Sequence, residues 1–145
     1  MSRSLLPFDG SPAATRALNY LVNQVLNDCR RPTEAEVHLV NIQPLANEWI
    51  VHRLLPETEL AMMARTYGEE TLAPAVAELT AAGIKTVTHI ERGEIAQTIS
   101  RLAGELCCNQ IVMGTRGFST LGDLLMGSVA TKVLHLATVP LTFVK

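Results

Sequence analysis

Short apolar runs alternate with longer segments of helical periodicity along the whole chain, and this alternation constrains the fold more than any other feature. The runs have the length and the large or β-branched apolar residues that are typical of strands. They cover residues 4–8, 37–42, 86–90, 110–113 and 139–144. Strands that alternate with helices at this spacing form a parallel sheet through right-handed crossovers. We therefore predict a single α/β domain over residues 1–145, with helices on both faces of the sheet.

The segments between the runs repeat their apolar residues every three or four positions, as one face of a helix does. They predict helices over about 12–29, 56–82, 95–106 and 127–136. Ser11 is the expected N-cap of the first helix, because Pro12 follows it at the first helical position. Pro74 is a candidate break in the second helix. Residues 45–55 have no clear period and include Trp49, so we interpret them as a loop that binds a partner, folds over a ligand or is simply anchored by the tryptophan.

The composition excludes several classes of function. The chain has 145 residues, of which 48% are apolar and 18% are charged, and this ratio is typical of one globular domain. Its formal net charge of -2 and its 12 lysines and arginines leave no broad basic surface for nucleic acid. No apolar run reaches the roughly 20 residues of a membrane helix, and the N-terminus meets proline and aspartate before a signal peptide can form. We expect a soluble, cytoplasmic protein that binds neither nucleic acid nor a membrane.

The cysteines and histidines predict neither a disulfide framework nor a metal site. Three cysteines cannot all pair with one another, and neighbours such as Cys107 and Cys108 bridge only with strain. These two follow an apolar helix face, so we interpret them as packing residues and not as a redox sensor. The four histidines are scattered, and the CxxC and HExxH motifs are both missing. His38 and His135 are accordingly expected to be packing or surface residues.

In a parallel α/β sheet the ligand binds beyond the carboxyl ends of the strands, where the strand order reverses. The first strand is followed by Asp9-Gly10-Ser11, which is not the GxGxxG fingerprint of dinucleotide-binding proteins. A GxxxxGK[ST] phosphate loop is missing too, so NAD-dependent dehydrogenases and P-loop NTPases are both disfavoured. Asp9 has three interpretations: it can accept hydrogen bonds from a ribose, bind a metal, or stabilise its own turn.

The end of the fourth strand is rich in glycine. Gly114 and Gly117 follow the strand, and Gly127 and Ser128 stand at the start of the last helix. Glycine lets a backbone approach a ligand closely, and a helix N-terminus presents free N–H groups to an anion. The residues alone are compatible with a phosphate site and with simple turns. Arg116, between the first two glycines, can pair with a phosphate or extend into solvent.

The spacing of these glycines resembles a known signature. Gly114-x2-Gly117-x9-Gly127-Ser128 matches the G-2x-G-9x-G-(S/T) nucleotide-binding motif of the universal stress protein family, and both gap lengths and the final serine agree. LLPFDGS near the start and VPLTFVK at the end extend the similarity over essentially the whole chain. The chain thus resembles a single-domain member of the ATP-binding subgroup. That resemblance implies a Rossmann-like sheet, of the adenine nucleotide alpha hydrolase type, with five parallel strands in the order 3-2-1-4-5.

The resemblance also implies a nucleotide site. Its residues are Pro7, Phe8, Asp9, Ile42, Met113, Gly114, Arg116, Gly117, Gly127, Ser128 and Val129. Those of the first strand lie against the adenosine, with the aspartate near the ribose, and the backbone of Ile42 (Asn41 if the alignment slips by one) meets adenine. The two fourth-strand residues line the ribose, and those from Gly117 onwards hold the phosphates of ATP, ADP or AMP. Mg²⁺ bridges phosphate oxygens instead of occupying a cage of protein ligands.

We interpret the chain as a nucleotide-binding regulatory protein with at most slow ATP hydrolysis, because no histidine or glutamate is placed by a motif as a general base. A dedicated ATPase or nucleotidyl transferase is the first alternative, but such transferases carry His-x-x-His where this chain has Pro-Phe-Asp-Gly-Ser. A dimer that has lost nucleotide binding is the second, and the intact glycine signature argues against it. Two departures from the family, Asn41 for histidine and Asn109 for aspartate, do not decide between these readings.

The last strand predicts self-association. Leu141 and Phe143 alternate with Thr142 and Val144, and an apolar strand at a sheet edge is a hazard unless something covers it. The family resemblance likewise implies a homodimer through residues 139–144, and twofold symmetry is the commonest way to close such a contact.

Overall fold

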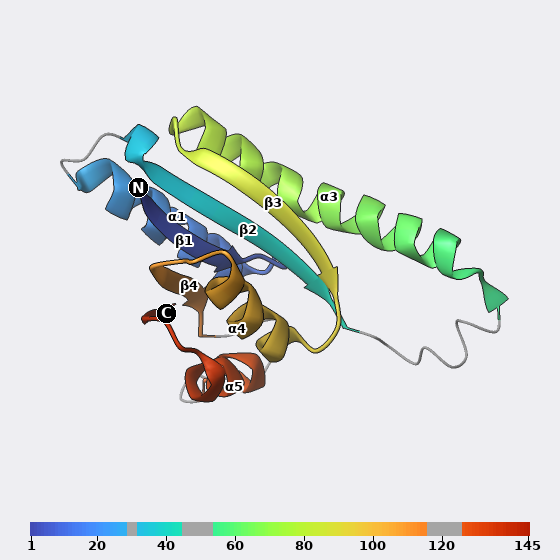
Figure 1. Cartoon of the computed structure of the whole chain (residues 1–145). Coiled ribbons are helices and arrows are strands. Elements are labelled where there is room, and N and C mark those ends of the chain that lie inside the picture. Colours follow the sequence, from blue (N-terminus) through green and yellow to red (C-terminus); the bar gives the residue numbers. More distant parts are fainter. Residues whose placement is uncertain (29–31, 45–53, 116–125) are drawn as a thin grey trace.

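The computed structural model describes residues 1–28, 32–44, 54–115 and 126–145 (Figure 1). The strands in these ranges are β1 (Ser2–Pro7), β2 (Ala35–Gln43), β3 (Lys85–Arg92), β4 (Gln110–Gly114) and β5 (Leu141–Val144). The helices are α1 (Pro12–Asn27), α3 (Glu57–Ala81), α4 (Ile95–Glu105) and α5 (Ser128–Leu136), with a short 3₁₀ turn, η1, at Pro32–Glu34. Most boundaries agree with the predicted ones within about two residues.

The strands lie parallel in one five-stranded sheet, in the order β3-β2-β1-β4-β5. This arrangement confirms the predicted α/β fold and its strand order. The chain starts in the middle of the sheet, because β1 pairs with β2 on one side and with β4 on the other. The strand order therefore reverses between β1 and β4, and sheets of this kind bind ligands beside the carboxyl ends of the strands at that reversal.

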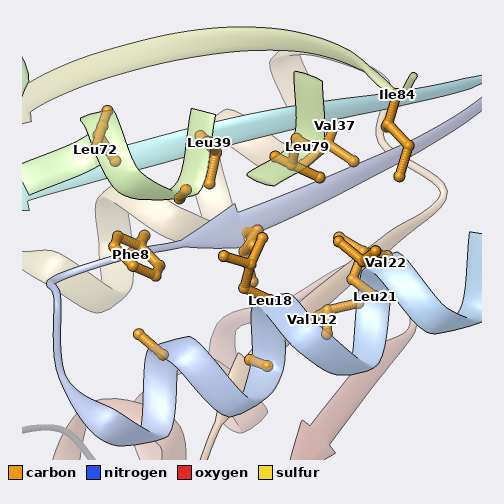
Figure 2. Packing of buried hydrophobic residues seen from close by; sticks show 14 residues of the cluster. Phe8, Leu18, Leu21, Val22, Val37, Leu39, Leu72, Leu79, Ile84 and Val112 are labelled. Atoms are coloured by element: carbon orange, nitrogen blue, oxygen red, sulfur yellow. The ribbon is translucent and has the colours of Figure 1, made fainter. Parts of the chain in front are cut away.

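Helices cover both faces of the sheet, as predicted. α1 and α3 pack on one face through a core cluster that contains Leu18, Leu39 and Leu72, and Figure 2 shows these side chains between the two helices and the strands. α4 and α5 pack on the other face through a second cluster around Ile99 and Ile111. Each fully buried side chain of this size stabilises the fold by about 1.5–3 kcal/mol. The two clusters therefore fix where the helices begin relative to the strand ends.

The turn from β1 into α1 forms as the sequence predicts. The Ser11 side chain accepts a hydrogen bond from the Ala14 N–H (3.1 Å) as the N-cap, and Pro12 is the first helical residue. Asp9 Oδ1 accepts a hydrogen bond from the Ser11 N–H (2.9 Å), so the interpretation of Asp9 as a turn-stabilising residue is confirmed. Gly10 has a φ of +78°, in the left-handed region that favours glycine. These contacts fix the start of α1 at the end of β1.

The end of β4 lies very close to the first turn of α1. A Cβ atom at Gly114 would stand 2.8 Å from both the Cβ and the carbonyl oxygen of Ala13. Non-bonded carbon atoms are optimally separated by about 3.5–4.0 Å, so no larger residue fits here without a shift of the helix. Packing alone therefore requires this glycine of the signature.

Two predicted features differ from the structure. The sequence predicts the last strand from residue 139, whereas β5 begins at Leu141. Pro140 has no N–H for a sheet ladder, and only its carbonyl takes part, accepting a hydrogen bond from the Ile111 N–H (2.9 Å). Pro74 does not break α3, which is a continuous helix of 25 residues from Glu57 to Ala81. Pro74 is exposed, so water can bond the carbonyl of Glu70 that has lost its helical donor.

Two predictions fall on other parts of the chain. Residues 45–55 are predicted to form a loop, and 45–53 of these lie outside the described residues. Cys29 lies outside them too. Within the described ranges, none of the helices has the length and apolarity that crossing a membrane requires.

Candidate functional site

A cavity of about 280 Å³ lies at the carboxyl ends of β1, β2 and β4 and beside the first residues of α1, α4 and α5. Its described lining consists of Pro7, Phe8, Asp9, Ser11, Ala14, Val40, Ile42, Ile95, Ile99, Met113, Gly114, Thr115, Gly127, Ser128, Val129 and Ala130. It occupies the reversal of strand order, where the fold places ligands. A second cavity, of about 90 Å³, is lined by residues at the other end of the sheet and is small for any organic cofactor.

Nine of the eleven residues that the resemblance assigns to a nucleotide line this one cavity. The other two, Arg116 and Gly117, lie outside the described residues. Of the two alternatives at the end of the second strand, Ile42 is in the lining and Asn41 is not. Sequence reasoning missed seven lining residues, which are Ser11, Ala14, Val40, Ile95, Ile99, Thr115 and Ala130. A helical apolar stripe gives no sign of which residues line a cavity and which fill a core, whereas Thr115 was detectable because it directly follows the strand.

One wall of the cavity is apolar. Val40 and Ile42 come from the end of β2, and Ile95 and Ile99 come from the start of α4, with Met113 from β4 beside them. Residues two apart on a strand and four apart on a helix share a face, which is why each pair reaches the same space. Branched aliphatic side chains that converge in this way fit a flat apolar ring.

A second part of the lining is the main chain that follows β1. The Phe8 N–H donates to the carbonyl oxygen of Val40 (2.8 Å), and the carbonyl oxygen of Phe8 accepts from the Asn41 side-chain amide (3.0 Å). The Phe8 ring is buried in the α1–α3 cluster together with Leu72, as Figure 2 shows. Phe8 therefore presents its main chain, and not its ring, to a ligand in the cavity.

Two of the three helices that begin at the cavity have a side-chain cap. Ser11 caps α1, and Asp9 adds a carboxylate to the same turn. Glu94 caps α4, since its carboxylate accepts a hydrogen bond from the Gln97 N–H (2.7 Å). The positive ends of these two helices are therefore already occupied by oxygen atoms of the protein.

The third helix, α5, has no side-chain cap. Gly127 is its N-cap residue, and the Gly127 N–H donates to the carbonyl oxygen of Thr115 (2.7 Å). The next N–H groups, from Ser128 to Ala130, have no helical acceptor and belong to residues that line the cavity. A free helix N-terminus has the electrostatic effect of about half a positive charge and binds anions. Because Asp9 is the only ionisable side chain of the described lining, the cavity is negative near α1 and positive near α5.

A model of the universal stress protein family matches residues 1–145 of this chain. The chain belongs to the universal stress protein family. A curated family member, universal stress protein YxiE of Bacillus subtilis (strain 168), is 27% identical over 154 residues, with 99% of each chain covered. The solved structure of the hypothetical protein MJ0577 superposes with a TM-score of 0.85 at 24% identity, covering 99% of this chain and 95% of that one.

Two solved relatives contain adenine nucleotides. A universal stress protein family protein from Arabidopsis thaliana was crystallised with AMP bound, and it has a TM-score of 0.71 at 14% identity, covering 100% of this chain and 92% of that one. Another universal stress protein was crystallised in complex with cAMP, with a TM-score of 0.66 at 19% identity and coverage of 99% and 95%. At such identities the superpositions show a shared fold.

This universal stress protein also has a buried hydrogen-bonded chain away from the cavity. His38 Nε2 lies 3.0 Å from a carboxylate oxygen of Glu36, and His38 Nδ1 lies 2.9 Å from His89 Nε2. A carboxylate only accepts, so Nε2 of His38 carries the proton of the bond to Glu36. Lys85 and Arg3 pair with the same Glu36 carboxylate. His38 is buried, which confirms its interpretation as a packing residue.

The pKa values of Glu36 and His89, the two ends of this hydrogen-bonded series, are both shifted. The hydrogen bond from Lys85 lowers the pKa of Glu36 against the opposing effect of burial, and His38 lowers it further. Burial, followed by the neighbouring His38, lowers the pKa of His89. The folded protein therefore favours a charged Glu36 and a neutral His89.

The cysteines and the remaining histidine are only partly as predicted. Cys108 is buried, and burial raises the pKa of its thiol, which agrees with an inert packing role. Cys107 is exposed, so its interpretation as a packing residue is wrong. It follows the C-cap of α4 in the left-handed region, with a φ of 52°. His135 is exposed, as expected of a surface residue, and within the described ranges no three His, Cys, Asp or Glu side chains are arranged to hold a metal ion.

Proposed function

We propose that this universal stress protein binds an adenine nucleotide in the cavity and that occupancy regulates its shape or its affinity for other proteins. The observation that carries the proposal is the asymmetry of the cavity, with an apolar wall at one part and an uncapped helix N-terminus at another. An adenine nucleotide has the same asymmetry, since a flat base is joined through ribose to anionic phosphates. The AMP and cAMP complexes of two relatives support this class of ligand, and the glycine signature favours ATP within it.

The lining suggests a role for each group of residues. The base packs against the apolar wall near Ile42, beside the main chain of Pro7 and Phe8. Asp9 Oδ1 is engaged by Ser11, which leaves Oδ2 to accept a hydrogen bond from a ribose hydroxyl, close to Met113 and Gly114. These residues place the phosphates toward α5.

The phosphates are proposed to accept hydrogen bonds from the free N–H groups of Ser128 and Val129 at the start of α5, with Gly127 close by. Gly117 and Arg116 complete this part of the site by resemblance to the family signature. Mg²⁺ fits as a companion of the nucleotide, because Asp9 is the only carboxylate in the described lining and cannot form a cage by itself. The ion would neutralise phosphate charge.

We infer regulation in preference to dedicated catalysis from the same lining. Its described residues include no histidine, glutamate or lysine, and the one carboxylate, Asp9, already accepts a hydrogen bond from the Ser11 N–H. General-base catalysis needs a free base within hydrogen-bond reach of the nucleophile. Steady-state turnover of Mg-ATP distinguishes the readings, because a rate of about 1 s⁻¹ or more is typical of enzymes and would favour an ATPase or nucleotidyl transferase.

We further propose a homodimer through β5. This strand is an edge of the sheet, and all four of its residues are half-buried. Two residues of the neighbouring α5, Leu134 and Leu136, are 51% and 46% exposed. An apolar edge of this kind is stabilised when a second copy pairs with it. Light scattering should give twice the mass of the chain, and a monomer at micromolar concentration would contradict this proposal.

The decisive experiment releases and identifies any bound nucleotide. Freshly purified protein is denatured, and the supernatant is analysed by mass spectrometry, in parallel with Ser128→Asp. The variant puts a carboxylate at the N-terminus of α5, which stabilises the free helix by about 0.3–1 kcal/mol and repels phosphate. We expect about one adenine nucleotide per wild-type chain and at least tenfold weaker binding by the variant, which corresponds to about 1.4 kcal/mol.

The control is Thr131→Asp, which adds the same charge one turn later on α5, at an exposed residue outside the lining. It should retain nucleotide. Wild-type protein that is empty and stays empty in calorimetry with added Mg-ATP would overturn the proposal and favour the dimer without nucleotide binding. Equal loss in both variants would show that general repulsion, and not the helix N-terminus, weakens binding.

A further inference from the structure

The first three turns of α3 bury few of their side chains. Over residues 57–67 only Leu60 and Ala64 are partly buried, and all the others are exposed. Met62, Met63 and Tyr67 are 70%, 60% and 57% exposed. The second half of the same helix is held by buried side chains on the sheet, as Figure 2 shows for Leu72 and Leu79. In Figure 1 the first half extends past the carboxyl ends of β2 and β3.

Two side chains of the sheet bond to this exposed half, Arg92 at the end of β3, which pairs with Glu57 (2.7 Å), and Gln43. The Gln43 side-chain amide, at the end of β2, donates to the carbonyl oxygen of Ala64 (2.6 Å). The same amide donates to the side-chain oxygen of Asn41 (3.2 Å). Both hydrogens of the Gln43 amide are thus in use, which fixes its orientation. Because only two side chains of residues 57–67 are partly buried, a hydrogen bond to the middle of this segment affects its stability more than it would in a buried helix.

The chain of hydrogen bonds continues to the cavity. Asn41 is 3% exposed, and its amide nitrogen donates to the carbonyl oxygen of Phe8 (3.0 Å). The peptide unit that Asn41 holds joins Phe8 to Asp9, two residues of the cavity lining. A ligand that contacts this peptide therefore acts on the first member of a series that runs from Phe8 through Asn41 and Gln43 to Ala64.

We propose that Asn41 and Gln43 are positioning residues that couple occupancy of the cavity to the order of residues 57–67 in α3. The inference rests on the proposed function, since it needs a ligand at Phe8 and Asp9. A bound nucleotide holds the Phe8–Asp9 peptide in the orientation that Asn41 already satisfies, and this favours the closed series of bonds over the opened one. The coupling is reciprocal, so the factor by which the nucleotide favours the ordered helix is also the factor by which loosening the helix lowers the affinity for the nucleotide.

Hydrogen exchange of the full-length protein, followed by mass spectrometry of peptides that cover residues 57–67, tests the coupling. The variant Gln43→Leu removes both amide bonds with little change of volume. The control is Gln110→Leu, the same substitution at the far end of the sheet, where the Gln110 amide donates to Ser4 Oγ (3.0 Å) and Gln24 Oε1 (3.4 Å). Calorimetry with Mg-ATP on each protein establishes binding and the concentration that saturates it.

Without nucleotide, Gln43→Leu should speed exchange over residues 57–67 by roughly two- to tenfold, the effect of one lost hydrogen bond on a local opening, whereas Gln110→Leu should leave it unchanged. Saturating Mg-ATP should slow exchange of this segment in the wild type and in Gln110→Leu. In Gln43→Leu the response should be lost, while the nucleotide affinity falls by at most about tenfold.

A second variant, Asn41→Asp, keeps the oxygen that accepts from Gln43 and loses the donor to Phe8. It should retain slow exchange over residues 57–67 without nucleotide and lose the response to Mg-ATP, a separation that a purely structural role of these side chains does not produce. Its thermal transition shows whether it folds.

The outcomes separate this inference from the function on which it rests. Binding of Mg-ATP without any response over residues 57–67 in the wild type overturns the coupling and leaves the proposed function standing. An equal response in Gln43→Leu and the wild type at saturation overturns the role of this series of bonds. A wild type that binds no nucleotide in calorimetry overturns the proposed function and the coupling together.

Discussion

Replacing Gly114 by alanine tests the close packing of β4 against the first turn of α1 beside the cavity. A Cβ at this position would lie 2.8 Å from the carbonyl oxygen of Ala13 and 2.9 Å from its carbonyl carbon. These are main-chain atoms of the first turn of α1, and Ala13 is 3% exposed, so no flexible side chain can move aside. Restoring a normal carbon contact near 3.5 Å requires α1 and β4 to separate by about 0.5–1 Å. Overpacking of this size typically destabilises a domain by about 1–3 kcal/mol.

Gly104→Ala is the matched control, because the same methyl group meets nothing within 4 Å there. Gly104 lies inside α4, where alanine is favoured over glycine by about 0.5–1 kcal/mol. The two substitutions should therefore change the free energy of unfolding in opposite directions. Urea unfolding followed by circular dichroism measures both, and thermal midpoints should shift by about 2–4 °C per kcal/mol.

The reasoning is refuted if Gly114→Ala is as stable as the wild type, or if both variants shift stability in the same direction with unchanged m-values. The clash between a Cβ at position 114 and Ala13 also has a consequence for the site. The first turn of α1 carries Ser11 and Ala14, which line the cavity. Gly114→Ala should therefore lower the affinity for the proposed nucleotide, whereas Gly104→Ala should not. Calorimetry on the two folded variants compares the two affinities.

Three further outcomes follow from single contacts. Folding lowers the pKa values of His89 and Glu36, so the unfolded chain binds more protons than the folded protein as the pH falls. The free energy of unfolding should therefore decrease below about pH 6.5, where His89 titrates in the unfolded chain, and again below about pH 4.3, where Glu36 does. In denaturation curves recorded against pH, His89→Gln should abolish only the first decrease. Cys107→Gly should raise stability by up to about 1 kcal/mol, because glycine adopts the positive φ of this residue without strain, and an unchanged urea midpoint would contradict that. Pro74→Ala should stabilise the protein by about 1–2 kcal/mol, because the hydrogen bond that alanine can donate to the Glu70 carbonyl outweighs the greater freedom of the unfolded chain; an unchanged or lower thermal midpoint would refute this.

The sequence was informative wherever one local signal decides the structure. The Ser11-Pro12 pair located the start of α1, and the spacing of the glycines located the cavity, because strand ends in a parallel sheet meet at one edge. The end of α3 at Ala81 was visible for the same reason, since Gly83 follows the C-cap with a φ of +71°.

Features that depend on register or on relative position were not visible. His38 and His89 meet because β2 and β3 pair with His38 opposite Val87 and with Val40 opposite His89, and no local pattern specifies that register. In the same way, Ile95 is part of an apolar stripe that is typical of any packed helix. Its place in the cavity lining depends on where the strands end relative to α4, which is a property of the assembled fold.

The N-terminus of α5 is where stability and function make different demands on the sequence. Gly127 has φ and ψ values of -58° and 157°, which any residue adopts, so its backbone does not require glycine. Ser, Asp or Asn at this position would cap the helix, as Ser11 and Glu94 cap the other two helices at the cavity. The oxygen of such a cap would also accept a hydrogen bond from one of the N–H groups of residues that line the cavity. A glycine there leaves these donors without a side-chain cap at a cost of a few tenths of a kcal/mol, and the proposed nucleotide phosphates would use them.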